Sequence, residues 1–166
     1  QSPTATAPPT NTPTVAADFR IGYVATNPTC VAVTELMALI LEGDFALQIA
    51  TVPFPDSAAL FEKLADKKPA ERVDLSFCYT DPDDRSYLQQ YFGFMLLVGS
   101  GYRQLNNQKF MIMSNAAVKS PIERGNPCLY RFLTNLQLDQ VDLSTGDVAA
   151  WYQNHAAQVA DWTRCE

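Results

Sequence analysis

The sequence predicts an α/β fold, built as a single three-layer lobe in which a mostly parallel five-stranded sheet is flanked by helices. Apolar segments of strand length alternate with segments of helical periodicity, and short turn signals separate them. Hydrophobic residues make up 47% of the 166-residue chain, which is enough to form a core. The roughly 150 residues that follow a Pro- and Thr-rich start suit one domain.

The first half of the chain carries three strand patterns and two helix patterns. In order they are a strand over 19–24, a helix over 30–42, a strand over 47–52, a helix from 56 or 57, and a strand over 73–78. Thr29 is the expected cap of the first helix, and Gly43 is its expected stop. This order, with its short connections, predicts parallel strands joined by right-handed crossovers.

The second half is predicted to complete the sheet and to end in helices. The expected elements are a helix over 84–92, strands over 94–98 and 109–113 that suit an antiparallel pair, and helices over 128–136 and 148–164. The stretch 114–127 is the most plausible return crossing, and it is too short to hold a second lobe. No internal repeat appears, so 18–166 is predicted to be one α/β domain.

Residues 1–17 predict a disordered tether rich in Pro and Thr. Such a segment commonly follows a removed signal peptide or a lipid-bearing cysteine, which favours an extracytoplasmic location in the periplasm or an equivalent lumen. A lipid anchor, as in a lipoprotein, is the only membrane contact this suggests, and an interdomain linker is the alternative. The net charge of −6 argues against a nucleic-acid partner.

Four widely spaced cysteines, Cys30, Cys78, Cys128 and Cys165, are compatible with two disulfides in an oxidising compartment. Cys30 and Cys78 fall on elements that neighbour each other in the usual strand order, and Cys128 and Cys165 belong to the last two helices. The connectivity stays open at this point, as does the alternative of four free thiols. No C-x-x-C pair accompanies the single histidine, His155, so no metal site is predicted.

A binding site is expected where the parallel strands end. In an open parallel sheet, ligands bind beyond the carboxyl ends of the strands, near helix N-termini. The candidate ligand-binding residues there are Tyr23, Thr26, Asn27, Thr29, Tyr79, Thr80, Asp81 and Arg85. Hydroxyl, amide and carboxylate groups around an aromatic ring suit a small polar ligand. The alternative is that these groups only cap helices and form turns.

The sequence contains no recognised catalytic set. It has no G-x-S-x-G elbow, no G-x-x-x-x-G-K-[ST] loop and no G-x-G-x-x-G turn. His155 lies in the predicted last helix, far in sequence from any candidate nucleophile. We therefore predict a protein that is not an enzyme and that needs no cofactor.

Two sequence patterns resemble a known family. They are the FRIGYV strand followed by a helix and then the strand VDLSFCY, and a terminal helix that ends in VADW. Together they resemble the first lobe of type II periplasmic binding proteins, particularly the glycine betaine/choline (OpuAC-like) group. Members of that group have two lobes, so the resemblance implies a chain reduced to a single lobe. It also implies Tyr79 as the one aromatic ring that would contact a ligand.

Two hypotheses for function follow from these patterns. The first is an exported accessory module that acts in protein interaction or assembly, with another extracytoplasmic or membrane protein, or a second copy of the chain, as its partner. The second is binding or sensing of a small polar solute, of amine or amino-acid type, in a transport system. A missing second lobe favours the first, and a pocket at the ends of the strands would favour the second.

Overall fold

The protein is described here by a computed structural model that covers residues 16–99, 103–105, 108–136, 138, 141, 143 and 146–165. Of the tether predicted over 1–17, all but Ala16 and Ala17 lies outside the described residues, so the tether and the lipid anchor stay predictions. Within these ranges no helix is long and apolar enough to cross a membrane.

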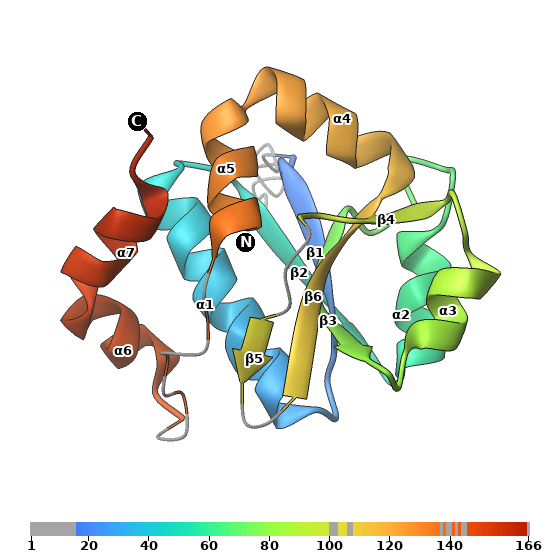
Figure 1. Ribbon diagram of the computed structural model, residues 1–166, viewed down its shortest axis with the longest axis horizontal. Coiled ribbons are helices and arrows are strands. Elements are labelled where there is room, and N and C mark those ends of the chain that lie inside the picture. The colour runs from blue at the N-terminus through green and yellow to red at the C-terminus, as the bar shows by residue number, and fades with distance from the viewer. Residues whose placement is uncertain are drawn as a thin grey trace, which may run out of the picture.

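One sheet lies at the centre of the described residues (Figure 1). Its strands are β1 (Phe19–Val24), β2 (Ile49–Phe54), β3 (Leu75–Asp81), β4 (Met95–Leu97), β5 (Arg103–Leu105) and β6 (Gln108–Asn115). The hydrogen-bonded order is β2-β1-β3-β6-β4, and the short β5 pairs with β6 off this path. β1 is parallel to β2 and β3, whereas β6 is antiparallel to β3, β4 and β5. The predicted α/β class and five-stranded path are confirmed, and β5 is a short addition. The sheet is mixed rather than mostly parallel, because every pairing of β6 is antiparallel.

Helices follow or separate the strands along the chain. They are α1 (Pro28–Asp44), α2 (Ser57–Leu64), α3 (Arg85–Gln90), α4 (Ala116–Gly125), α5 (Pro127–Asn135), α6 (Val148–Asn154) and α7 (Ala156–Thr163). The sequence predicts all of these positions except α4. The single helix expected over 148–164 is divided at His155.

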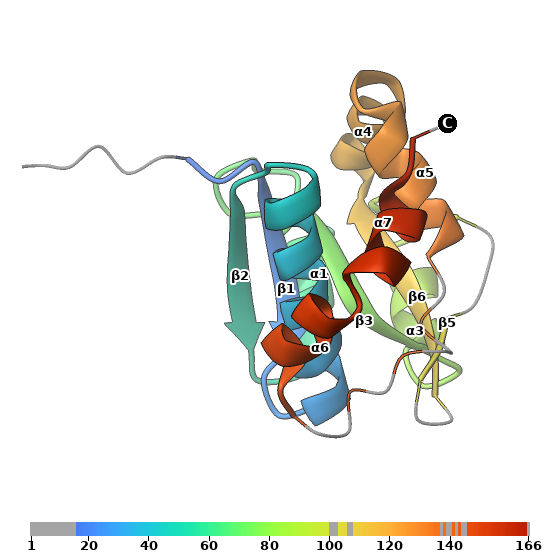
Figure 2. The same cartoon turned by 90° about the vertical axis from the view of Figure 1, so that its left-hand side faces the viewer.

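Helices cover both faces of the sheet, which gives three layers (Figures 1 and 2). On one face, α1 and α4 to α7 share a large cluster of buried apolar side chains with the strands. On the other face, α2 and α3 pack over a smaller cluster that includes Leu60, Phe61 and Tyr79. β3 is buried on both faces along nearly all its length, as expected of an inner strand of such a sheet.

The stretch 114–127, for which the sequence predicts no helix, contains the end of β6 and the helix α4. Asn115 ends the strand and caps the helix, because its side-chain oxygen accepts a hydrogen bond from Ala117 N at 2.9 Å. Pro121 inside the helix made helix an unfavourable prediction from sequence. Burial of Val118 and Ile122 against the core offsets that cost.

Candidate functional site

The carboxyl ends of β1, β2 and β3 meet at one edge of the sheet because these strands are parallel neighbours. It is the edge toward which the β2 arrow points in Figure 2. Three connections leave it, into α1, α2 and α3. We call residues 25–29, 55–57 and 80–85 the carboxyl rim. The structure thus brings most of the candidate residues to one edge of the sheet.

The first part of the rim is organised by Asn27. Its Oδ1 accepts hydrogen bonds from Thr29 N at 3.1 Å and Cys30 N at 3.2 Å, so Asn27 caps α1. Thr29, which the sequence suggested as the cap, instead lies inside the first turn. Thr26 is exposed, and its hydroxyl donates to the Pro55 carbonyl at 3.5 Å, a weak link between the first two loops.

Asp84 ties the third loop together from within. Its Oδ2 accepts hydrogen bonds from Thr80 N at 2.9 Å and from the Thr80 hydroxyl at 3.1 Å. Burial raises the pKa of the Asp84 carboxyl, although hydrogen bonds from Thr80 and Ser57 act in the opposite direction. Because Ser57 begins α2, this carboxyl also joins the third loop to the second.

Replacing Asp84 with asparagine should raise the free energy of unfolding at neutral pH, and the gain should shrink in acid. A carboxyl whose pKa is raised in the folded state binds its proton more tightly there than in the unfolded chain. The wild-type fold therefore gains stability as the pH falls through that raised pKa toward the ordinary value of 3.8. Urea denaturation of both proteins across this pH range measures the difference. A gain that stays constant with pH would contradict the assignment.

Asp81 and Arg85 form the charged part of the rim. Arg85 donates from Nε and Nη2 to Asp81 Oδ1 at 3.0 and 2.9 Å, and from Nη2 to Oδ2 at 2.9 Å. The two residues are four positions apart, at the end of β3 and the start of α3. The Arg85 side chain is 58% exposed and the Asp81 side chain 13% exposed, so the guanidinium is open to solvent while the carboxylate is largely covered.

The two candidate tyrosines do not lie side by side at the rim. Tyr79 is only 1% exposed and packs edge-to-face against Phe61, with ring centroids 6.0 Å apart. Its ring is part of the core beneath the rim. Tyr23 is half-buried and lines a separate hollow of about 330 Å³ between α1 and β2, together with Glu35 and Leu39.

Two disulfides connect the cysteines. Cys30 at the start of α1 is joined to Cys78 in β3, with Cα atoms 5.2 Å apart, directly beneath the rim. Cys128 in α5 is joined to Cys165 beyond α7, with Cα atoms 5.3 Å apart. The first bridge stiffens the support of the rim, and the second holds the end of the described chain against α5.

The sequence places Ser57 and Asp84 in the rim loops, but it does not predict that their side chains connect the second loop to the third. Among the described residues, no group of three or more His, Cys, Asp or Glu side chains is placed to hold a metal ion.

Comparison with known proteins supports the fold. No protein-family model matches the chain, and no curated protein matches it in sequence. Among solved structures, it is similar to the closed, liganded form of lactococcal OpuAC in complex with glycine betaine. The TM-score is 0.63 at 9% sequence identity, and the match covers 88% of this chain and 99% of that chain. This chain has the fold of a solute-binding-protein lobe. At 9% identity, the likeness shows a shared fold and no more.

Proposed function

We propose that this chain is an exported module that binds a small polar solute of amine or amino-acid type at the carboxyl rim, without catalysis. The observation that carries the proposal is the Asp81–Arg85 pair, which places an exposed guanidinium beside a carboxylate at the edge where open α/β sheets bind ligands. The fold shared with a glycine betaine complex supports the same class of ligand.

The pair fits a zwitterion for a physical reason. A ligand carboxylate can accept from the guanidinium of Arg85, and a ligand ammonium can approach the carboxylate of Asp81. Each charged group of the ligand then takes over hydrogen bonding that Asp81 and Arg85 otherwise give to each other. The Asn27 amide and the Thr26 hydroxyl are neutral polar groups on the first loop of the same rim.

The proposed location is extracytoplasmic. Two disulfides persist in an oxidising compartment and are rare in a reducing one. A role in a transport system, with another extracytoplasmic or membrane protein as partner, accords with the solute-binding-protein fold. This part of the proposal extends beyond what the rim alone supports.

An interaction or assembly role is the second candidate, and one surface favours it. Phe92 is 84% exposed and Phe94 is 42% exposed, both in the turn between α3 and β4. The ammonium of Lys67 lies 4.7 Å from the centre of the Phe94 ring. An exposed aromatic pair of this kind is typical of a protein-interaction surface.

Isothermal titration with glycine betaine, glycine and proline tests the solute-binding proposal. We expect at least one of these solutes to bind, and Arg85→Gln to weaken that binding about tenfold or more, because a charge-assisted hydrogen bond contributes roughly 1.5–3 kcal/mol. Arg164→Gln is the matched control. Arg164 also pairs with an aspartate close to it in sequence, Asp161, and is 59% exposed, but it lies directly after α7.

The control variant should bind as the wild type does. If none of the three zwitterions binds, the rim is not the proposed site. Equal affinities for the wild type and Arg85→Gln would remove Arg85 from it. A solute-independent complex recovered by pull-down, and lost on Phe92→Ser, would instead support the interaction role.

A further inference from the structure

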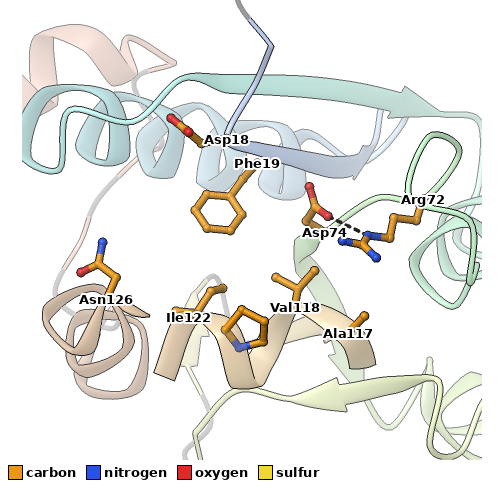
Figure 3. Close-up of a pocket in the computed structure, with 9 residues that line it drawn as sticks. Asp18, Phe19, Arg72, Asp74, Ala117, Val118, Ile122 and Asn126 are labelled. Carbon is orange, nitrogen blue, oxygen red and sulfur yellow. Dashed lines mark hydrogen bonds and ion pairs between the residues drawn. The ribbon is translucent and has the colours of Figure 1, made fainter. Parts of the chain in front are cut away.

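A second pocket lies at the opposite edge of the sheet, between the amino ends of β1 and β3 and the helix α4 (Figure 3). Its volume is about 220 Å³, below the roughly 300–1,000 Å³ of pockets for drug-sized ligands. It is therefore too small for a drug-sized ligand but large enough for a short aliphatic chain with polar ends. None of its lining residues belongs to the carboxyl rim.

One end of the pocket carries the guanidinium of Arg72, which an ion pair with Asp74 holds in place. Arg72 donates from Nε to Asp74 Oδ1 at 3.2 Å, and Asp74 Oδ2 accepts from the backbone N–H of Arg20 at 2.8 Å. Within the described part of the chain, no hydrogen bond engages the two Nη groups of Arg72. The guanidinium is mostly shielded from solvent, so these donors are available to an anionic group inside the pocket.

The other end carries an acidic and an amide group. Figure 3 places Asp18 and Asn126 on the far side of the Phe19 ring from Arg72. Asp18 Oδ2 accepts from Gln48 N at 2.7 Å, and no hydrogen bond to its second oxygen is seen in the described ranges. This end therefore favours a cation, whereas the Arg72 end favours an anion.

The middle of the pocket is apolar. The Phe19 ring faces Val118 and Ile122 of α4 across it (Figure 3). Pro121 also lines the pocket and has no N–H, so the carbonyl of Ala117, one turn earlier, lacks its helical donor.

We infer that this pocket binds a linear amino carboxylate whose two charged ends are separated by a short aliphatic chain. The carboxylate accepts from the Nη groups of Arg72. The chain lies between Phe19 and Ile122, and the ammonium reaches Asp18. The site differs from the carboxyl rim in place and in ligand, because an α-amino acid carries its two charges too close together to reach both ends of this pocket.

Titration calorimetry with γ-aminobutyrate, δ-aminovalerate and ε-aminocaproate tests this inference. We expect binding that depends on chain length, with one member of the series best. Valerate, which lacks the amine, and pentylamine, which lacks the carboxylate, should each bind at least tenfold more weakly than the best member. Norvaline should be equally weak, because its charges are adjacent.

Variants then locate the site. Arg72→Gln should weaken binding of the best member tenfold or more, and Arg85→Gln at the rim should leave it unchanged. Failure of the rim proposal and failure of this one are therefore distinguishable. Because Arg72→Gln also breaks the pair with Asp74, amide chemical shifts of the unaltered protein provide a second measurement. The amides of Phe19, Ala117 and Ile122 should shift on titration.

Three results would overturn the inference. The first is that no member of the series binds. The second is that valerate or pentylamine binds as tightly as the best amino carboxylate. The third is that the amide shifts fall on the carboxyl rim and spare Phe19 and α4.

Discussion

Replacing Cys30 and Cys78 together with alanine should lower the free energy of unfolding by about 4 kcal/mol or more. The bridge joins residues that are 48 positions apart, and closure of a loop of that length in the unfolded chain accounts for about 4 kcal/mol. Two-state urea denaturation of the double variant and the wild type measures the loss.

Burial should add to this entropic loss. Both cysteines are buried, and Cys30 Sγ accepts a hydrogen bond from Val24 N at 3.2 Å. The Thr34 hydroxyl donates to Cys78 Sγ at 3.8 Å from the facing side of α1. Alanine removes both sulfur atoms, leaves a small cavity between α1 and β3, and leaves these two donors without an acceptor.

The second disulfide provides a matched control. Cys128 and Cys165 are 37 positions apart, so loop closure contributes nearly the same amount, also about 4 kcal/mol. Cys165 is exposed and Cys128 is half-buried, so their removal leaves no buried cavity. The first double variant should therefore be the less stable of the two. Equal losses would show that burial of the first bridge contributes nothing measurable.

Most of the sheet was predictable because each strand on its main path has a sequence pattern typical of a strand. The 73–78 pattern of β-branched and aromatic residues predicts a strand buried on both faces, and β3 extends three residues further, to Asp81. The five strands on the main path were all expected. The short β5 was not, since three residues carry too little periodicity to predict a strand.

The helices after β6 show where local patterns fail. α4 carries Pro121, which disfavours helix, and tertiary burial of one face decides in its favour. The break between α6 and α7 falls at no Pro or Gly, so no local signal predicts it. His155 lies there with its ring stacked on Trp151 at 4.2 Å, a contact that no sequence pattern specifies.

The candidate site was predictable in position but not in detail. The parallel order of the strands places four residues at one edge of the sheet, independently of the direction in which their side chains point: Asn27, Thr80, Asp81 and Arg85. Which way Tyr79 points depends on an irregularity in the pairing of β3 with β6, between Ser76 and Tyr79. The pocket beside Arg72 could not be foreseen, because its other wall is α4.

Replacing Asn115 with alanine should lower the free energy of unfolding by about 3 kcal/mol or more, through several lost contacts at one buried side chain. Asn115 Nδ2 donates to the carbonyls of Leu64 at 2.7 Å and Asp66 at 2.8 Å, where α2 ends. Its Oδ1 caps α4 through Ala117 N. Loss of the cap costs about 1 kcal/mol, and each buried carbonyl left without a donor adds about 1–3 kcal/mol.

Asn126→Ala measures how much a helix cap alone contributes to the free energy of unfolding. Asn126 caps α5 through a single hydrogen bond from Leu129 N at 3.1 Å and is only half-buried. This substitution should cost about 1 kcal/mol. Asn115→Asp preserves the capping oxygen but removes both donations to α2 and buries a charge, so it should be no more stable than the alanine variant. If urea denaturation finds Asn115→Ala and Asn126→Ala equally destabilised, the amide of Asn115 does not join α2 to α4, and the cap alone explains its effect.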